Sequence, residues 1–469
     1  MEETIKENCG LAGIYGNELA AKILYFSLFS LQHRGQESAG IMISDGKEIL
    51  IHRGMGLVSE VFNYSDLEKI KGNFGIGHVR YSTTGSSNIK NIQPFYIEYQ
   101  GKTYGVAHNG NLVNSHSLKS YLENKGAIFQ TTMDSEIILH LIVRSPGASI
   151  KEKITHALKK LKGAFSLLFF TNNEIIAVRD SYGWRPLSIG KINNSYVIAS
   201  ETCAFDLIGA QYIRDVQPGE MVLFNQNGME SFFWEETKSK QYCIFEFIYF
   251  ARPDSHIFEA SVYNTRKRLG EKLAEEFPFD GDIVLPIPDS GNLAALGFSQ
   301  KRNIPIEIGI IKNHYIGRTF IQPSQKIRDL DVKIKLNPVR DIIKNKNIIV
   351  IEDSIVRGTT CKNRVNALRQ AGAKKIYMGV SCPPIISPCY YGIDFPSKEE
   401  LIASNKTIEE VRRFLGLDGL YYLSLEGMLN SMFINKDNFC TSCFTGKYLV
   451  KPEKNFSKYQ LEKCILKDI

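Results

Sequence analysis

The sequence IIVIEDSIVRGTT occupies residues 348–360 and joins an apolar run to two carboxylates, a glycine and three hydroxyl side chains. The apolar run predicts a buried strand. Residues 359–371 have apolar positions at helical spacing and are followed by Gly372, a typical helix stop. The segment is therefore expected to form a strand, a turn and a helix. Glu352 and Asp353 fall at the carboxyl end of that strand, where open α/β sheets bind ligands.

This turn has the composition of a site for a phosphorylated sugar. Main-chain N–H groups and the positive end of the helix attract a phosphate, and nearby hydroxyls add donors. Glu352 and Asp353 would bind sugar hydroxyls or a divalent cation. An acidic strand end followed by an ordinary helix cap is the alternative interpretation, because caps of this kind are common.

Around this segment, short apolar runs alternate with longer amphipathic stretches. The alternation predicts a parallel sheet with connecting helices. The strands are expected at Ile283–Pro286, Ile306–Ile311, Ile348–Ile351 and Ile376–Val380.

The complete string resembles the fingerprint of the type I phosphoribosyltransferases, which bind 5-phosphoribosyl pyrophosphate (PRPP). The resemblance implies that Glu352, which stands where that family usually has Asp, and Asp353 lie at the ribose hydroxyls and a Mg²⁺ site, with one ion per subunit. It also implies a set of residues around the 5′-phosphate: Ser354, Val356, Arg357, Gly358 and Thr359.

Two neighbouring segments fit the same site. The sequence Pro288–Gly291 follows a predicted strand and would direct its amides and Ser290 toward the pyrophosphate or its metal, although alone it indicates only a turn. The basic stretch Lys312–Arg328 suits a lid over an anionic substrate, with a solvated basic loop as the alternative. The lid residues expected to bind PRPP are Lys312, Arg318 and Lys326.

The first half has a different pattern, with many short strands bounded by Gly, Asn and Asp. Helices are predicted at Ala20–Leu31 and at Asp134–Val143, where Asp134 is expected to cap the helix. Strands are expected at Gly75–Val79, Tyr104–Ala107, Ala164–Phe170, Ile175–Val178 and Tyr196–Ala199. A polar run, Glu235–Gln241, places the boundary between the halves near residue 240.

Four ordered motifs in this half, together with Cys9, resemble the class II glutamine amidotransferases. The motifs are HRGQESAG (33–40), GHVRYST (77–83), AHNGN (107–111) and TMDSE (132–136). The resemblance implies the N-terminal nucleophile fold, a four-layer αββα sandwich. In that fold the first residue of the mature chain supplies both the nucleophile and the base.

Cys9 would be that residue. A thiol of pKa about 8.5 is only slightly ionised at neutral pH, whereas a terminal amine of pKa about 7.7 to 8.0 has a substantial free-base fraction and can act as the base. Residues 1–8 precede Cys9, so they are expected to be a propeptide, cut at the Asn8–Cys9 bond.

The resemblance also assigns the glutamine contacts. Arg80 would pair with the α-carboxylate of glutamine, and Asp134 would receive its α-ammonium. Asn109 and Gly110 would form the oxyanion hole. Asn-Gly is in addition the commonest hairpin dipeptide, and a turn is expected at this position as well.

Together the two halves resemble the amidophosphoribosyltransferase family, which opens purine biosynthesis. The resemblance implies that ammonia from glutamine displaces pyrophosphate from PRPP to give 5-phosphoribosylamine. The expected division is residues 1–8 propeptide, 9–240 glutaminase domain and 241–469 phosphoribosyltransferase domain. A PRPP-binding regulator and a glutamine-dependent hexosamine-phosphate synthase are the alternatives, but the first needs no glutaminase and the second no PRPP.

Four cysteines resemble those of an iron-sulfur subgroup of this family that is made with a propeptide. The CxxC pair Cys440 and Cys443 alone suits zinc, redox chemistry or a cluster. With Cys243 and Cys389, the resemblance implies one 4Fe-4S cluster per subunit. Cys382 lies close to Cys389 in the sequence, and only the family context favours Cys389.

The composition of the chain limits the classes of protein to which it can belong. The chain has 469 residues, 43% of them hydrophobic, and a net charge of +7 without a long basic patch, so a globular protein without nucleic-acid binding is expected. No apolar stretch approaches the length needed to span a membrane and no signal peptide is evident, so a cytoplasmic protein is expected. The family resemblance further implies a homotetramer inhibited by purine nucleotides.

Overall fold

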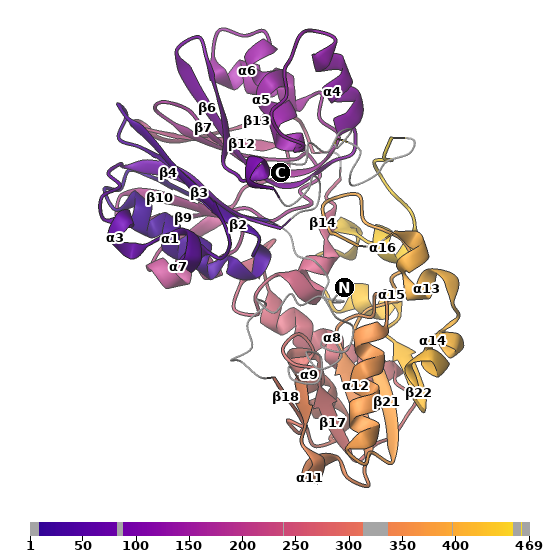
Figure 1. Cartoon of the computed structure of the whole chain (residues 1–469). Helices are drawn as coiled ribbons and strands as arrows, with labels where there is room; N and C mark the ends of the chain where they lie inside the picture. The colour runs from indigo at the N-terminus through magenta and orange to yellow at the C-terminus, as the bar shows by residue number, and fades with distance from the viewer. Residues whose placement is uncertain are drawn as a thin grey trace, which may run out of the picture.

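The computed structural model describes residues 9–81, 88–237, 239–312, 336–395, 397–453 and 461. The chain forms an upper, indigo-to-magenta part built on two stacked sheets and a lower, pink-to-yellow part built on a parallel sheet (Figure 1). No helix among the described residues is long and apolar enough to cross a lipid bilayer.

Two antiparallel sheets form the first part. The seven-stranded sheet has the order β11-β9-β10-β1-β4-β2-β3. Its strands are β1 (Gly10–Tyr15), β2 (Ser38–Ser44), β3 (Ile49–Met55), β4 (Phe74–Arg80), β9 (Ser188–Ile192), β10 (Ser195–Ala199) and β11 (Gln211–Asp215). The six-stranded sheet has the order β13-β12-β8-β7-β6-β5. Its strands are β5 (Phe95–Tyr99), β6 (Lys102–Leu112), β7 (Gly163–Phe170), β8 (Ile175–Arg179), β12 (Glu220–Asn225) and β13 (Gly228–Phe233).

Helices cover the outer faces of both sheets. The seven-stranded sheet carries α1 (Ala20–Ser30) and α7 (Cys203–Ile208), and the six-stranded sheet carries α4 (Ser115–Glu123), α5 (Asp134–Arg144) and α6 (Ile150–Leu158). Alternation along β7 shows why the layers form. Leu168 and Phe170 pack between the sheets, whereas Leu167 and Phe169 pack under the helices. The predicted αββα sandwich is confirmed.

The second part has a parallel sheet in the order β17-β20-β21-β22. Its strands are β17 (Ile283–Pro286), β20 (Asn347–Glu352), β21 (Lys375–Val380) and β22 (Gly419–Tyr422), and its main helices are α8 (Val262–Glu276), α9 (Asn292–Arg302), α12 (Thr359–Gln370), α14 (Ile408–Leu415) and α15 (Leu425–Asn430). One core of buried side chains joins the sheet to these helices. The predicted parallel sheet is confirmed.

Short elements complete the described chain. They are η1 (Gln32–Arg34), α2 (Val58–Val61), α3 (Tyr64–Leu67), η2 (Ile89–Asn91), β14 (Tyr242–Cys243), the π-helix η3 (Glu246–Phe250), β15 (His256–Ile257), β16 (Ala260–Ser261), β18 (Ile310–Lys312), β19 (Leu336–Pro338), α11 (Arg340–Ile343), η4 (Lys398–Glu400), α13 (Ile402–Asn405), η5 (Lys436–Asn438), β23 (Phe439–Cys440) and α16 (Ser442–Thr445).

One predicted strand, Ile306–Ile311, is wrong in its extent. Ile306 makes only an isolated bridge to Val284, and the regular strand is β18, which pairs with β19 in a separate sheet. Pro305 has no N–H to extend the pairing, and Ile308 is 67% exposed, so it contributes no packing to the parallel sheet. The run is apolar, but it lies at an edge.

Candidate active sites

Cys9 lies immediately before β1 and is buried. Its thiol donates to the carbonyl oxygen of Tyr81 at 3.6 Å, and its own carbonyl oxygen accepts from Arg34 Nε at 3.2 Å. Burial raises the pKa of this thiol above its ordinary value, with the charge of Arg80 opposing the effect. The thiol therefore needs a base to become a nucleophile.

Asp134 is held as an anion beside Cys9. Its Oδ2 accepts from the backbone N–H of Leu112 at 3.1 Å, and its Oδ1 lies 3.3 Å from His108 Nδ1. Burial favours the neutral acid, but His108 and backbone donors outweigh it and hold the pKa of Asp134 below its ordinary value. Arg80, buried at the end of β4, also acts on the Cys9 thiol. Asp134 and Arg80 therefore place one negative and one positive charge near the thiol, as the two charged groups of a free amino acid require.

The capping role expected for Asp134 is wrong. Met133 is the residue that precedes α5, and Asp134 is the first residue of the helix. Its carboxylate turns to Leu112 of β6 instead. Sequence spacing locates the helix end but cannot show which neighbour the carboxylate meets.

Asn109 and Gly110 lie inside β6, where they pair with Ser166 and Phe165 of β7. The hairpin expected from this dipeptide is therefore wrong, because the strand continues to Leu112. The Asn109 side chain is fully buried, and neither its nitrogen nor its oxygen has a hydrogen-bond partner among the described residues. An unpaired buried amide is costly, so this donor is available for a bound group.

The carboxylates of the second site lie at the end of β20. Glu352 accepts from Arg364 Nη1 of α12 at 2.6 Å, and Asp353 accepts from the Ser354 hydroxyl. Burial raises the pKa of Glu352 to about 8, with Arg364 opposing it. Glu352 is thus already paired with a cation, whereas the buried Asp353 is bonded to its neighbouring hydroxyl.

The turn after these carboxylates leads into α12. Gly358 precedes the helix with φ +82°, a left-handed conformation that favours glycine, and Thr359 is the first helical residue. Arg357 pairs with Glu400 at 3.3 Å, and the carbonyl of Val356 accepts from Ile402 N at 2.9 Å. The turn is therefore anchored on α13 and η4, with the helix start behind it.

The turn Pro288–Gly291 reaches the same sheet edge because β17 and β20 are parallel neighbours, with Pro286 opposite Ile351. Ile287 N donates to Ile351 O at 3.0 Å, and an added Cβ on Gly291 would lie 2.5 Å from that oxygen. Ser290 is half-buried at this edge. Lys312, at the end of β18, pairs with Asp289. The other expected lid residues, Arg318 and Lys326, lie outside the described residues.

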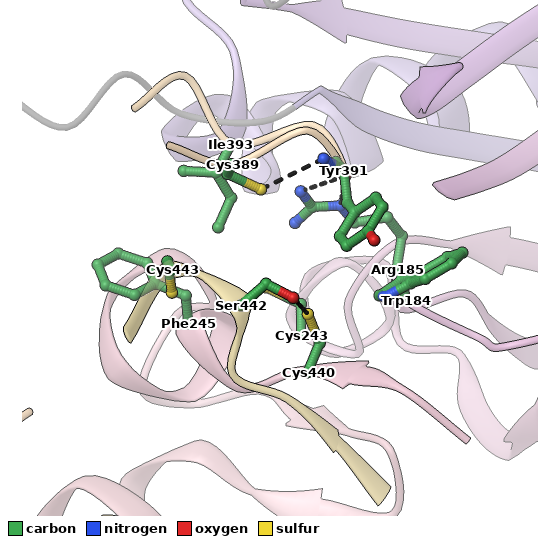
Figure 2. Close-up of a pocket in the computed structure, with 10 residues that line it drawn as sticks. All are labelled: Trp184, Arg185, Cys243, Phe245, Cys389, Tyr391, Ile393, Cys440, Ser442 and Cys443. Carbon is green, nitrogen blue, oxygen red and sulfur yellow. Dashed lines mark hydrogen bonds between the residues drawn. The ribbon is translucent and has the colours of Figure 1, made fainter. Parts of the chain in front are cut away.

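The four expected cluster cysteines line one pocket (Figure 2). Cys243 of β14 lies opposite Cys440 of β23 in a parallel pair, and Cys443 follows on α16. The segment with Cys389 joins them because Ile386 N and Ser387 N donate to Cys443 O at 3.0 and 3.1 Å. Cys382 is not among the residues that line the pocket.

These thiols suit a group that fills the pocket. Burial raises the pKa of Cys243 to about 12 and raises those of Cys389, Cys440 and Cys443, so without a metal they are neutral. Among the described residues, no three His, Cys, Asp or Glu side chains converge as ligands of a single ion would. Thiols arranged around a cavity fit a multi-iron cluster.

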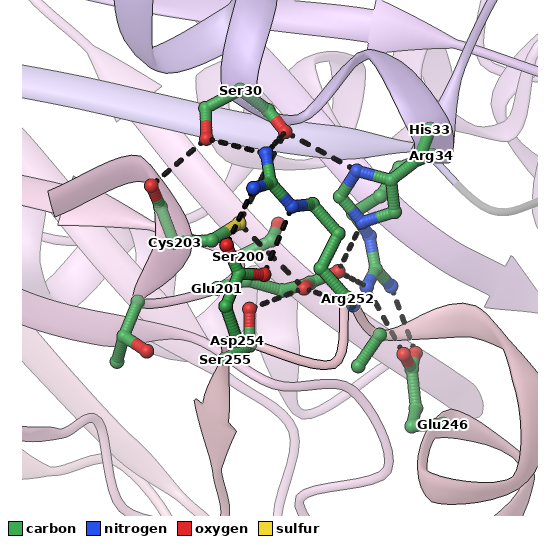
Figure 3. Close-up of polar contacts among 12 residues, drawn as sticks. Ser30, His33, Arg34, Ser200, Glu201, Cys203, Glu246, Arg252, Asp254 and Ser255 are labelled. Atoms are coloured by element: carbon green, nitrogen blue, oxygen red, sulfur yellow. Dashed lines mark hydrogen bonds and ion pairs between the residues drawn. The ribbon is translucent and has the colours of Figure 1, made fainter. Parts of the chain in front are cut away.

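A buried ion network between the two parts was not predicted from the sequence (Figure 3). Arg34 donates to Glu246 at 2.8 and 3.0 Å and to Glu201, and Glu201 also accepts from His33 at 2.8 Å. Arg185 donates to Glu246 at 3.1 Å. Arg34 lies within the quoted HRGQESAG motif, but its partners come from distant segments that no spacing rule connects.

Comparison with known proteins agrees with both halves. A model of the glutamine amidotransferase domain matches residues 78–206, which include Arg80, Asn109, Gly110 and Asp134. The chain is 47% identical over 449 residues to amidophosphoribosyltransferase of Bacillus subtilis, covering 95% of this chain and 94% of the relative. It is 45% identical over 466 residues to the enzyme of Methanothermobacter thermautotrophicus, covering 98% of both chains.

The chain belongs to the amidophosphoribosyltransferase family.

Two solved structures of the family share its fold. Glutamine PRPP amidotransferase from B. subtilis, complexed with ADP and GMP, is 45% identical with a TM-score of 0.91, covering 97% of this chain and 100% of that chain. A structure described as the allosteric regulatory enzyme of purine biosynthesis is 46% identical with a TM-score of 0.93, covering 98% and 100%. The expected family, fold and activity at the first committed step of purine biosynthesis are confirmed. The regulator and hexosamine-phosphate alternatives are set aside.

Proposed function

We propose that this chain makes 5-phosphoribosylamine by hydrolysing glutamine at Cys9 and passing the ammonia to PRPP in its second half. The observation that carries the first step is the buried Cys9 thiol together with the unpaired amide of Asn109. The thiol supplies the nucleophile, and the unpaired amide of Asn109 supplies a donor for the oxyanion.

Removal of residues 1–8, which lie outside the described residues, would free the amine of Cys9. That amine takes the thiol proton as the sulfur attacks the amide carbon of glutamine, and it returns the proton to the departing ammonia, which leaves a glutamyl thioester on Cys9. Water then hydrolyses the thioester, with the same amine taking its proton, and glutamate leaves as the thiol is restored. Because burial raises the pKa of the thiol, a base on the same residue is needed to ionise it at neutral pH.

Two charged groups orient the glutamine, and two N–H donors bind the oxyanion of the intermediate. Arg80 binds its α-carboxylate and Asp134 its α-ammonium, which matches the opposite charges beside the thiol. The Asn109 amide and the Gly110 N–H donate to the oxygen of the tetrahedral intermediate. Losing one such donor typically lowers the rate by about 10² to 10³.

In the second site, main-chain groups of the turn 354–359 and the start of α12 hold the 5′-phosphate of PRPP. Asp353 binds the ribose hydroxyls, and Glu352, Asp353 and Ser290 lie where they can contact a Mg²⁺ ion on PRPP. Such an ion neutralises the departing pyrophosphate, and Mg²⁺ is commonly held by one or two carboxylates plus substrate phosphates. Lys312, and Arg318 and Lys326 in the lid, add positive charge.

A buried arginine, Arg266, feels the charges of Asp353 in the second site and of the Glu201 and Glu246 network. Arg266 of α8 donates to the carbonyls of Phe247, Tyr249 and Ala251 at 2.7 Å in each case. Burial lowers its pKa to about 10, and the charges of Asp353, Glu201 and Glu246 oppose that shift. Transfer between the two sites requires a passage that excludes water, because ammonia in contact with water is mostly protonated and not nucleophilic.

Two cofactors belong to the proposal. We propose one 4Fe-4S cluster per subunit, ligated by Cys243, Cys389, Cys440 and Cys443, and one Mg²⁺ with PRPP. No step of the reaction transfers electrons, so the cluster has a structural role, tying segments that are far apart in the sequence.

Assembly, location and regulation extend the proposal. A homotetramer in the cytoplasm is proposed from the family resemblance. Inhibition by purine nucleotides is supported by the B. subtilis relative, whose structure is complexed with ADP and GMP.

The stoichiometry of the reaction tests the proposal. With glutamine and PRPP, each pyrophosphate released should accompany one glutamate. Glutamate formed without PRPP-dependent pyrophosphate would show that the second site does not use the ammonia.

A further inference from the structure

The segment Cys389–Gly392 lies between the cysteine-lined pocket and the strand that carries the oxyanion residues. Asn111 Nδ2 of β6 donates to the carbonyl of Tyr390 at 2.8 Å. An added Cβ on Gly392 would lie 3.0 Å from the carbonyl carbon of Gly110 and 3.1 Å from Arg185 Nη2. The backbone of this segment therefore contacts β6, the strand that carries Asn109 and Gly110 and is called the oxyanion strand below.

A second connection runs from the same segment to the nucleophile. Arg185 donates through Nε and Nη2 to the carbonyl of Tyr391 at 3.1 and 2.8 Å (Figure 2). Its Nη1 donates to Glu246 at 3.1 Å. Glu246 accepts two bonds from Arg34 (Figure 3). Arg34 Nε donates to the carbonyl of Cys9. All these charged side chains are buried.

The segment itself is held firmly. The ring of Tyr391 stacks on Trp184 with centroids 4.5 Å apart, and its hydroxyl donates to Val450 O at 2.8 Å. Tyr391 N donates to Cys389 Sγ at 3.3 Å. Buried charge networks of this kind fix geometry, because moving one member leaves the others unpaired.

We propose that Cys389–Gly392 is a positioning element for the glutaminase reaction, with Gly392 and Asn111 setting the oxyanion strand and Arg185 setting the Cys9 backbone. The inference rests on the proposed function and extends it: the cluster, by holding Cys389, fixes one end of the element. Glutamine chemistry then depends on the pocket through the contacts of Asn111, Arg185 and Gly392, none of which is assigned to PRPP.

Gly392→Ala tests this directly, because the added methyl group would push the segment from Gly110. The 3.0 Å contact forces a shift of a few tenths of an ångström at Gly110, and a displacement of about 1 Å in a catalytic group can cost about 10²-fold in rate. We expect the kcat with glutamine to fall about 3- to 10-fold, with the KM for glutamine changed less than about twofold, since Arg80 and Asp134 are untouched. Turnover with ammonium should stay within about twofold.

Gly416→Ala is the matched control. Gly392 and Gly416 both have a positive φ, +105° and +75°, but an added Cβ on Gly416 meets no atom within 4 Å. Gly416→Ala introduces a comparable backbone strain without a steric clash. Its turnover with glutamine and its turnover with ammonium should therefore change by the same factor. Asn111→Ala, which removes the bond to Tyr390 without adding bulk, is the second variant and should lower glutamine-dependent kcat selectively.

Iron and sulfide content and the rate of Cys9 alkylation by a diazoketone glutamine analogue provide readouts that do not depend on PRPP. The inference predicts unchanged iron and slower alkylation in Gly392→Ala. Unaltered glutamine-dependent kcat in both Gly392→Ala and Asn111→Ala, or equal losses with glutamine and ammonium, would overturn it. A wild-type protein that releases pyrophosphate with neither donor would instead contradict the proposed function.

Discussion

Cys243 and Cys440 lie directly opposite each other in the parallel pair that β14 forms with β23, although the whole phosphoribosyltransferase sheet separates them in sequence. Cys243 N also donates to Trp184 O at 3.1 Å, so this pair is anchored on the glutaminase half. The proposed cluster would thus form where the two halves of the chain meet.

Anaerobically purified protein should contain about four iron and four sulfide per chain, since four thiols ligate one such cluster. Cys440→Ser should lose the cluster and lower the melting temperature, because the thiols no longer tie β14, β23 and the Cys389 segment together. Cys382→Ala is the control and should retain iron, because Cys382 is outside the pocket. Zinc in place of iron, or full iron in Cys440→Ser, would contradict the ligand assignment.

Asp353→Asn should lower pyrophosphate release about 10²-fold with both glutamine and ammonium, because both reactions use the carboxylate at the ribose and metal. Alkylation of Cys9 by the glutamine analogue should continue. The exposed Glu409, paired with Arg412 on α14, offers a control: Glu409→Gln should change turnover less than twofold. An unchanged PRPP saturation curve in Asp353→Asn would remove Asp353 from the site.

Glu201→Gln should destabilise the protein by about 3 kcal/mol at pH 7, because it leaves the buried Arg34 short of a charge partner. Although burial opposes ionisation, His33 and Arg34 hold the pKa of Glu201 well below its ordinary value of 4.5. The Glu201 contribution is therefore complete above about pH 4.5 and is lost as the pH falls toward the folded-state pKa. The difference in free energy of unfolding between wild type and Glu201→Gln, measured in urea, should be largest at pH 7 and should decrease below pH 4.5. A difference that increases in acid would contradict the lowered pKa of Glu201.

The positions of site residues that lie within one continuous motif could be predicted from the sequence. The alternation of strand and helix placed Glu352 and Asp353 at the end of β20, and the structure has them there. Asn109 was expected in a turn and lies within β6, because pairing with β7 outweighs the local preference of Asn-Gly. The sequence did not predict the roles of Arg185, Glu246 and Gly392. Their partners lie in distant segments that come together only in the folded chain.

Cys9→Ala provides the most direct test of the central claim, that ammonia released at Cys9 reaches PRPP in the second half. Pyrophosphate release is measured with PRPP and either glutamine or ammonium as nitrogen donor, together with the intact mass of the wild-type chain. The account predicts a mature wild-type chain beginning at Cys9 and active with both donors, and a Cys9→Ala variant active with ammonium alone. Glutamine-dependent pyrophosphate release by Cys9→Ala, or full activity in a chain that retains residues 1–8, would contradict it.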